Sequence, residues 1–112
     1  MKVSVRTSAR EDILRQYFYY AVEKDAAPAA DRFLAGVQSA FEFLCGMPDA
    51  GAPKLLDNPA LSGLRSWPVA GFSAIRVYYI HSGDDLLIVR VLHGKRDVSP
   101  LLEDDAGDEE LS

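Results

Sequence analysis

Cysteine and histidine are scarce in this chain of 112 residues. The single cysteine, Cys45, excludes an internal disulfide and any metal site built from several cysteines. Because only His81 and His93 could join it, the sequence predicts no zinc site, and we expect no cofactor. The longest apolar runs are under ten residues, which is too short to cross a membrane, and residues 1–6 lack the apolar stretch of a signal peptide. We therefore expect a cytoplasmic protein.

The length of the chain allows one domain with a modest hydrophobic core. Apolar residues make up 48 % of the sequence and charged residues 26 %, which is typical of a globular protein. A core of this size leaves little room for a deep catalytic cleft. We therefore expect function to lie on a face or in a shallow groove.

Negative charge is concentrated at one end of the chain. The net charge of −5 comes from 12 basic and 17 acidic residues, and residues 103–112 hold six of the acids and no base. Residues 1–102 therefore carry a charge of +1. Like charges repel one another, and the last ten residues have almost no apolar surface to bury. The sequence predicts one domain over residues 1–102 and a disordered acidic tail over residues 103–112.

The first half of the sequence predicts one strand and a helical hairpin. Apolar and polar side chains alternate over residues 3–5, as they do in a strand. Ser8 and Glu11 have the spacing of a capping box, which predicts a helix that begins there and ends near Lys24. Pro28 suits the first turn of a second helix, which lies antiparallel to the first because the break is short. The residues expected to face the core are Ile13, Leu14, Tyr17, Phe18, Tyr20 and Ala21 on the first helix and Phe33, Val37, Ala40, Phe41 and Leu44 on the second.

The second half predicts a loop and three strands. Residues 48–63 are rich in proline, glycine, aspartate and asparagine, which is typical of a loop. Strands follow over residues 64–67, 72–80 and 86–92, and Pro68 ends the first of them. The last is apolar enough to be an inner strand buried on both faces. The order β-α-α-β-β-β predicts an α+β fold, with the helical hairpin packed on a small, mainly antiparallel sheet.

Four stretches of the sequence carry a family resemblance. Ala29–Phe33 opens the second helix, Gly63–Val69 contains the first of the later strands, and Phe72–Tyr79 lies in the next. The most specific is Ile88–Asp97, in which the last strand ends in Arg90-Val91-Leu92-His93-Gly94-Lys95-Arg96. In these stretches and in the order of its elements, the chain resembles the RelE/ParE superfamily of toxins from type II toxin–antitoxin systems. It is most similar to the ParE-like branch, which includes plasmid stabilisation proteins. The resemblance implies a cognate antitoxin whose C-terminal segment wraps the toxin.

The resemblance leaves two activities open. ParE-like toxins inhibit DNA gyrase by binding it, whereas RelE-like toxins are ribosome-dependent endoribonucleases that cleave mRNA. Cleavage of RNA needs a base, an acid and positive charge beside the phosphate. Guanidinium groups bind phosphate with two parallel hydrogen bonds, and some nucleases of the superfamily have a His–Tyr pair where His93 stands. The catalytic candidates of the nuclease alternative are Arg65, Arg76, Arg90 and His93.

The sequence departs from the nuclease pattern in two ways. Gly94 follows His93 where those nucleases have an aromatic residue, and no tyrosine occurs after Tyr79. A charge of +1 is also low for a protein whose affinity for RNA would come from phosphate contacts. We therefore expect a ParE-like gyrase inhibitor rather than an enzyme, with mRNA cleavage as the alternative. A member that keeps its antitoxin but has lost its toxicity is a third interpretation.

The predicted binding residues form two sets. The target-binding set is Arg65, Arg76, His93, Lys95 and Arg96, because the resemblance implies action through the C-terminal region. The antitoxin-binding set is Tyr19, Phe43 and Trp67, which are more aromatic side chains than a small core can enclose. We expect the antitoxin to lie in an apolar groove between the helical hairpin and the sheet. A structural interpretation competes for the arginines and for His93, because strand arginines also pair with carboxylates and histidines also form hydrogen bonds at strand ends.

Overall fold

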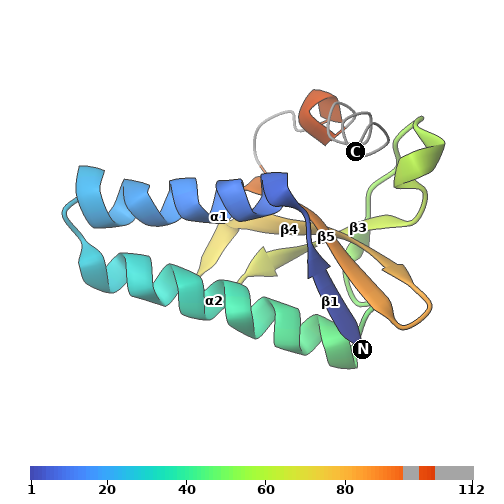
Figure 1. The fold of residues 1–112 in the computed structure, drawn as a ribbon, viewed down its shortest axis with the longest axis horizontal. Helices are drawn as coiled ribbons and strands as arrows, with labels where there is room; N and C mark the ends of the chain where they lie inside the picture. Colours follow the sequence, from blue (N-terminus) through green and yellow to red (C-terminus); the bar gives the residue numbers. More distant parts are fainter. Residues whose placement is uncertain (95–98, 103–112) are drawn as a thin grey trace.

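The computed structural model describes residues 1–94 and 99–102. Two helices lie side by side and pack against a twisted sheet (Figure 1). The elements are β1 (Lys2–Val5), α1 (Thr7–Phe18), η1 (Tyr19–Glu23), α2 (Ala27–Gly46), β2 (Ala52–Pro53), η2 (Pro59–Leu61), β3 (Leu64–Val69), β4 (Phe72–Ser82) and β5 (Asp85–His93). This arrangement confirms the predicted α+β fold.

The five strands form one sheet in the order β1-β5-β4-β3-β2. β1 runs parallel to β5 and the other pairs are antiparallel, so the sheet is mainly antiparallel as predicted. β5 lies between β1 and β4, and only its end residues, Asp85 and His93, are exposed. The prediction of an inner strand buried on both faces is therefore confirmed.

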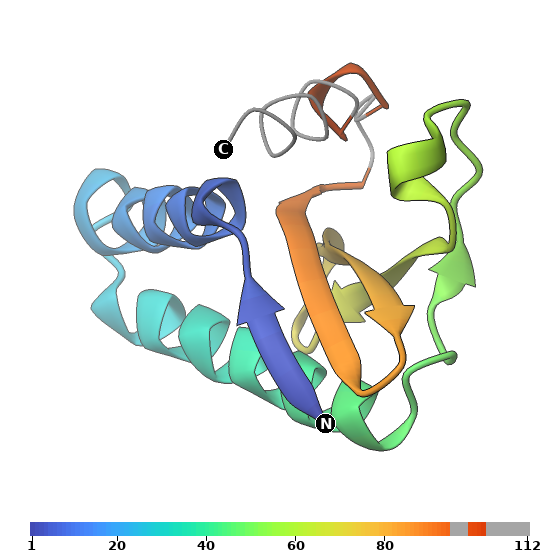
Figure 2. The same cartoon turned by 45° about the vertical axis from the view of Figure 1, so that its right-hand side comes forward.

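Apolar side chains cover both faces of the sheet. The face toward the helices holds the main core, whose largest members include Phe33, Leu44, Val77, Tyr79, Leu86 and Ile88. The opposite face holds a second core of Leu61, Leu64, Tyr78, Val89, Leu92 and Leu102. Leu102 is completely buried, and Figure 2 shows its segment above the sheet on the side of η2. The sheet is therefore the middle layer of the molecule.

α2 is a helix of 20 residues with Pro28 in its first turn, as predicted. Phe33, Val37, Ala40 and Leu44 are buried and Phe41 packs beside them, which confirms the predicted apolar face. At Gly36 the helix lies so close to the β3–β4 turn that a Cβ atom would collide with the carbonyl oxygen of Ala70. Within the described parts of the chain, neither this helix nor any other is long and apolar enough to span a membrane.

The predicted capping box at the start of the first helix is wrong. α1 begins at Thr7, directly after its N-cap residue Arg6, and no side chain caps it. The backbone N–H of Arg6 donates to the carbonyl oxygen of Ile88 on β5 at 3.1 Å, while the carbonyl of Arg6 accepts from the N–H of Arg10 at 3.0 Å. Pairing with β5 therefore fixes the residue at which strand becomes helix, and Ser8 falls inside the first turn.

The predicted apolar stripe on α1 is wrong at two positions. Leu14 and Phe18 are 54 % and 55 % exposed, whereas Asp12 is buried with 4 % exposed. The stripe is rotated because a carboxylate of α1 bonds to β5, as described below.

Two predictions for the second half also need correction. β3 does not end before Pro68 but continues to Val69. The pairing with β4 is irregular between Pro68 and Val69, which accommodates a residue that has no N–H. The predicted loop over residues 48–63 contains the two short elements β2 and η2. A two-residue edge strand is too short to show periodicity, so the sequence gives no signal for it.

Candidate functional site

An open groove runs along α1 beside the end of β5, and we name it the α1–β5 groove. It consists of two adjoining hollows with volumes of about 550 and about 90 Å³. Both are lined by Arg15, Gln16 and His93. The larger hollow is also lined by Tyr19, Tyr20 and Lys24. The smaller is also lined by Asp12, Ile75, Val91 and Leu92.

Asp12 fastens α1 to β5 beneath this groove. β1 pairs with β5 only as far as Ile88, so β1 supplies no partner for the backbone of Val91. The Asp12 carboxylate takes that place: it accepts the N–H of Val91 at 3.0 Å and the side chain of Arg90 at 2.6 and 2.7 Å. The side chains of Asp12 and Arg90 are 2 % and 12 % exposed. Such a buried pair holds the helix to the strand, because loss of either partner leaves an uncompensated charge.

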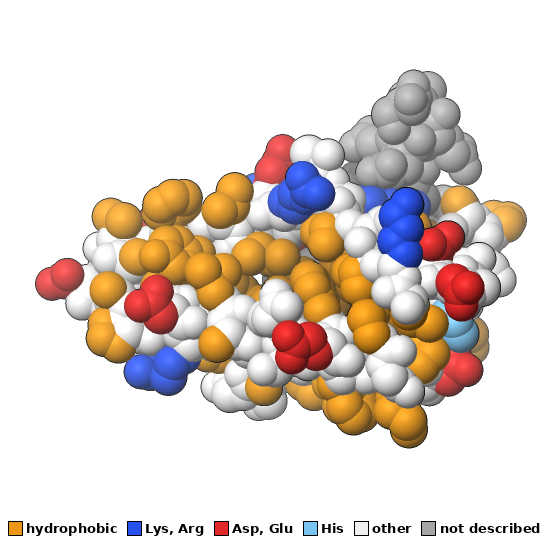
Figure 3. Space-filling view, turned by 60° about the horizontal axis from the view of Figure 1, so that its bottom comes forward, with side chains coloured by type: hydrophobic (Ala, Val, Ile, Leu, Met, Phe, Trp, Pro, Cys, Tyr) orange, Lys and Arg blue, Asp and Glu red, His pale blue; other side chains and the backbone are white. Residues whose placement is uncertain are grey.

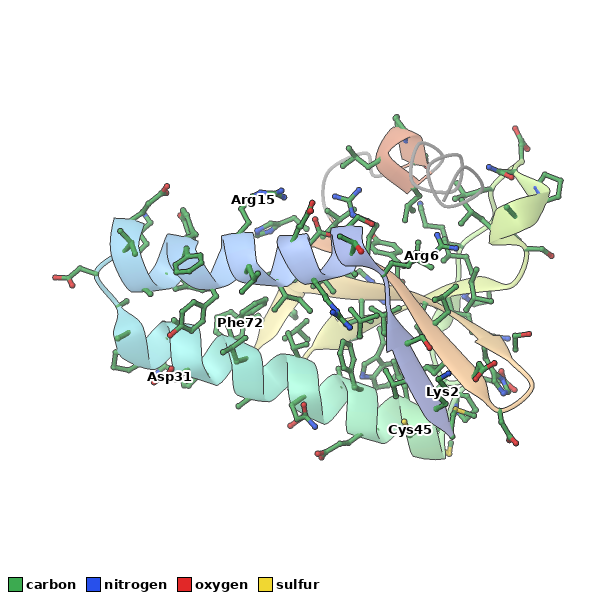
Figure 4. All side chains as sticks on the ribbon, viewed as in Figure 1. Lys2, Arg6, Arg15, Asp31, Cys45 and Phe72 are labelled. Atoms are coloured by element: carbon green, nitrogen blue, oxygen red, sulfur yellow. The ribbon has the colours of Figure 1, made fainter. Side chains whose placement is uncertain are left out.

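Arg15 lies one turn after Asp12 and faces the same carboxylate. Its guanidinium is 3.5 Å from Oδ1 of Asp12, a distance at which a hydrogen bond is weak. The Arg15 side chain is 71 % exposed and extends from α1 on the side away from α2 (Figure 4). The Arg15 side chain therefore lies on the surface of the groove, whereas the Arg90 side chain lies beneath it and holds α1 to β5.

α1 continues into the π-helical turn η1, which begins with Tyr19 and Tyr20. A π-helical turn is wider than an α-helical turn, and the two adjacent tyrosine side chains lie in different surroundings. The ring of Tyr20 lies 6.0 Å from that of Phe33 and 5.3 Å from that of Phe72, which is between the two helices in Figure 4. Tyr19 is 38 % exposed, with Nζ of Lys24 5.5 Å from its ring centroid. Tyr20 therefore packs against the main core, whereas the ring of Tyr19 lines the groove and is exposed there.

Two further strand arginines bond within the fold. Nη1 of Arg65 donates to the carbonyl oxygens of Gly51 at 2.8 Å and Asp49 at 3.1 Å. Nε of Arg76 donates to Oγ of Ser66 at 2.9 Å and Nη2 to its carbonyl oxygen at 3.2 Å. Each of the strand arginines Arg65, Arg76 and Arg90 therefore bonds to a partner within the protein, as the structural interpretation predicted.

At the other end of the hairpin, the loop after α2 is tied to the sheet. The hydroxyl of Tyr79 donates to the carbonyl oxygen of Pro48 at 2.7 Å and accepts the N–H of Gly51 at 2.9 Å. Burial raises the pKa of Tyr79, so the hydroxyl keeps its proton for the bond to Pro48. A Cβ atom on Gly51 would lie 2.5 Å from the Tyr79 hydroxyl, so the loop approaches the sheet too closely for a side chain there.

His81 makes a further bond between this loop and the sheet. Its Nδ1 lies 3.0 Å from the carboxylate of Asp49, and its Nε2 lies 2.9 Å from the carbonyl oxygen of Gly83. The hydrogen bond to Asp49 raises the pKa of His81. Both neighbours are acceptors, so the doubly protonated imidazolium satisfies the geometry. We name Asp49, Arg65, Tyr79 and His81 the loop clasp.

Asp12 and most of the loop clasp were not among the residues predicted from the sequence. A signal for Asp12 was present, because it lies one residue from Ile13 within the apolar stripe of α1. A carboxylate in that place needs a buried partner. The bonds of Tyr79 and His81 to the loop join residues 28 to 32 positions apart, so sequence spacing gives no signal for them.

A family model described as "ParE toxin of type II toxin-antitoxin system, parDE" matches residues 3–98. The chain belongs to the ParE toxin family. Its fold is similar to that of a solved chain described as "Chromosomal ParDE TA system from P. aeruginosa", with a TM-score of 0.63 and 16 % identity. That similarity covers 83 % of this chain and 95 % of the other, and it shows the fold alone. No curated protein matches the sequence.

Membership of the ParE family confirms the resemblance to this superfamily and branch. It also gives the protein its place in a toxin–antitoxin system, in which the partner is a cognate antitoxin.

This ParE-family fold does not bring the four candidates of the nuclease alternative together. His93 lines the α1–β5 groove, and Arg90 is paired beneath it. Arg65 is held in the loop clasp at the other end of the hairpin. Arg76 bonds to Ser66 beside the second core, on the opposite face of the sheet from the groove.

The predicted antitoxin-binding residues lie at two ends of the ParE-family hairpin. Phe43 of α2 stacks on Trp67 of β3 with ring centroids 4.7 Å apart and an interplanar angle of 17°. Tyr19 lies at the opposite end of the hairpin, where α1 leads into α2 (Figure 1). Two members of the target-binding set, Lys95 and Arg96, lie outside the described residues, as does the predicted tail over residues 103–112.

Large apolar side chains are exposed along the hairpin. They are Leu14, Phe18, Tyr19, Val22, Leu34 and Phe43, with Met47 directly after α2. Figure 3 shows apolar side chains spread over this part of the molecule, with single charged side chains between them.

Proposed function

We propose that this ParE-family toxin acts in the cytoplasm by binding DNA gyrase and that a ParD-type antitoxin neutralises it. The observation that carries binding over catalysis is the separation of the four nuclease candidates. Arg65, Arg76 and Arg90 use their side chains to hold the fold. Cleavage of RNA would need a base, an acid and phosphate-binding groups around one reacting atom. The choice of gyrase follows the ParE-like sequence.

The target surface in this proposal is the end of β5 and the residues that follow it. It consists of His93, Lys95, Arg96 and Arg76, whose side chain lies beside Gly94 directly after β5. Arg65, the remaining predicted member, is held in the loop clasp at the other end of the hairpin, so it would form a separate contact with the target. Arg96→Ala is the simplest test of this surface, with circular dichroism of the purified variant as the check on folding. We expect the variant to fold normally and to be less toxic. Undiminished toxicity would remove Arg96 from the target-binding set.

The antitoxin segment in this proposal lies in the α1–β5 groove, between the hairpin and the sheet. Tyr19 and His93 line the same hollow, so a segment that packs on Tyr19 also covers His93. Neutralisation then follows from occlusion of a target-binding residue. The stacked pair of Phe43 and Trp67 supplies a second contact at the other end of α2.

The experiment that tests the proposal is controlled expression of the toxin in bacteria. Plasmid supercoiling and the 5′ ends of mRNA are measured in the same cultures, with and without the antitoxin gene. We expect altered plasmid topology and intact mRNA, both returned to normal by the antitoxin. Cleaved mRNA with normally supercoiled plasmid would replace the proposal with an mRNA endoribonuclease.

A further inference from the structure

The fold uses only part of the hydrogen-bonding capacity of Arg76 on β4. Nε donates to Oγ of Ser66 at 2.9 Å, and Nη2 donates to the carbonyl oxygen of Ser66 at 3.2 Å. A guanidinium has five N–H donors, and these two bonds occupy the edge formed by Nε and Nη2. Within residues 1–94 and 99–102, Nη1 makes no hydrogen bond or ion pair. The edge formed by Nη1 and the second N–H of Nη2 can therefore bind another acceptor.

Arg76 lines an open hollow at the ends of β4 and β5, which we name the Arg76 hollow. Ser73, Ala74 and Gly94 are the other described residues that line it, and its volume is about 260 Å³. Sites for small molecules typically measure about 300–1,000 Å³, so this hollow suits one side chain of a partner better than a free ligand. Its described lining has one cation and no acid. The hollow therefore favours a negatively charged side chain.

Gly94 allows the side chain of Arg76 to lie in this position. The N–H of Gly94 donates to the carbonyl oxygen of Ala74 at 2.7 Å, which holds the end of β5 against β4. A Cβ atom on Gly94 would lie 2.6 Å from Cδ and 3.0 Å from Cγ of Arg76. The arginine stem therefore crosses the backbone directly after β5, while Ser66 holds its guanidinium. The binding edge is thus oriented before a partner arrives, which reduces the entropy lost on binding.

We propose that the Arg76 hollow receives an aspartate or glutamate side chain of the gyrase protein, whose carboxylate bonds to the Nη1–Nη2 edge of Arg76. This inference rests on the proposed function, because it assigns the chemistry of one contact on the target surface at the end of β5. An arginine binds a carboxylate through two parallel N–H···O bonds, and it stays charged at physiological pH. Such a contact selects a partner by both charge and geometry.

A protein carboxylate fits the Arg76 hollow better than a DNA phosphate does. Residues 1–94 hold ten basic and ten acidic side chains. Affinity for DNA comes from many phosphate contacts, and a neutral body with a single cation in the hollow offers few. One carboxylate needs only the one forked edge that Arg76 provides.

Ser73→Asp, with Ser73→Asn as its matched control, tests the proposal without changing Arg76. Ser73 is exposed and lines the hollow, so an aspartate there places a carboxylate that competes with the carboxylate of gyrase. Surface plasmon resonance measures binding to purified gyrase without DNA at low and high salt. We expect Ser73→Asp to weaken binding about tenfold at low salt and less at high salt, because salt screens the ionic contact. Ser73→Asn has the same shape without the charge and should change affinity by less than about twofold.

Substitution of Arg76 separates the forked edge from the charge. Arg76→Lys keeps the charge without the fork and Arg76→Gln removes both, so affinity for gyrase should fall in the order wild type, Arg76→Lys, Arg76→Gln. Arg32→Gln is the control, because Arg32 is exposed on α2 and lines a different hollow. Affinity for the antitoxin is the second readout. It should be unchanged in every variant, since Arg76 and the α1–β5 groove lie on opposite faces of the sheet.

The results that would overturn the inference have different meanings. Tight binding of gyrase by the wild type, with equal affinities of Ser73→Asp and Ser73→Asn, would overturn this inference alone. Failure of the wild type to bind gyrase would overturn it together with the proposed function. Equal losses of gyrase and antitoxin affinity in Ser73→Asp would show that the hollow is not specific to the target. Binding of a 20-base-pair DNA duplex that is lost in Ser73→Asp, with affinity for gyrase kept, would assign the hollow to a DNA phosphate instead.

Discussion

The two ends of the helical hairpin use the same types of residue in opposite ways. In the loop clasp, Arg65, Tyr79 and His81 all bond to the loop after α2. In the α1–β5 groove, Arg15 and Lys24 are exposed and make at most weak contacts. The difference shows that residue type alone does not separate an arginine or histidine that holds the fold from one whose side chain stays exposed; the bonds formed within the fold separate them.

The same contrast exists within one site, between Arg90 and Arg15. Both guanidinium groups face Asp12, one from β5 and one from α1. Burial and distance separate their roles, since the Arg90 side chain is 12 % exposed and Arg15 is 71 % exposed. Substitutions at the two positions should therefore affect different properties of the toxin.

The largest effect is expected at Asp12. Asp12→Ala removes the partner of a buried arginine and the acceptor for the N–H of Val91, so we expect a loss of about 3–5 kcal/mol in the free energy of unfolding. Urea unfolding followed by circular dichroism measures it. Arg15→Ala is the control, with an expected change of about 0.5 kcal/mol or less. Equal losses for the two variants would show that Arg15 also supports the fold.

A smaller effect is expected at Gly51, which bonds to Tyr79 and Arg65 of the loop clasp. A Cβ atom there would lie 2.5 Å from the Tyr79 hydroxyl and 2.9 Å from the carbonyl oxygen of Ser66. Gly51→Ala should therefore cost about 1–3 kcal/mol, because the loop must move away from the sheet. Gly46→Ala is the matched control, since Gly46 has nothing within 4 Å of the added atom. A neutral Gly51→Ala variant would mean that the clasp tolerates a shifted loop.

The smallest effect is expected from protonation of His81. The hydrogen bond to Asp49 raises its pKa above the ordinary value of 6.5. The contribution to stability is therefore fully present below about pH 6.5 and is lost as the pH rises through the folded-state pKa. Titration of the imidazole by NMR checks this, and Asp49→Asn should bring the pKa down toward the ordinary value. An unshifted pKa in the wild type would remove His81 from the clasp.

The sequence was informative where a local pattern determines the structure. The nearly continuous apolar run over residues 86–92 predicted an inner strand, and the apolar spacing from Phe33 to Leu44 predicted the buried face of α2. Both patterns lie within a single element. The fold class followed from the order of elements and was confirmed.

The sequence was misleading where a distant residue determines the local structure. α1 starts two residues earlier than its capping pattern indicates, with Arg6 instead of Ser8 as the N-cap, because Arg6 pairs with Ile88 on β5. Its apolar stripe is rotated because Asp12 bonds to Arg90, 78 positions away. The loop clasp is formed by similar long-range bonds. Such contacts depend on which strands become neighbours in the sheet, and the spacing of residues along the chain does not predict that order.

The central claim is that this ParE-family toxin acts by binding gyrase and not by catalysis. Titration of the purified toxin into a gyrase supercoiling reaction, with a synthetic mRNA and ribosomes in a parallel reaction, tests it most directly. If the toxin acts by binding gyrase, supercoiling falls with the ratio of toxin to gyrase, the antitoxin restores it, and the mRNA stays intact. Full supercoiling at excess toxin together with cleaved mRNA would contradict gyrase binding as the activity.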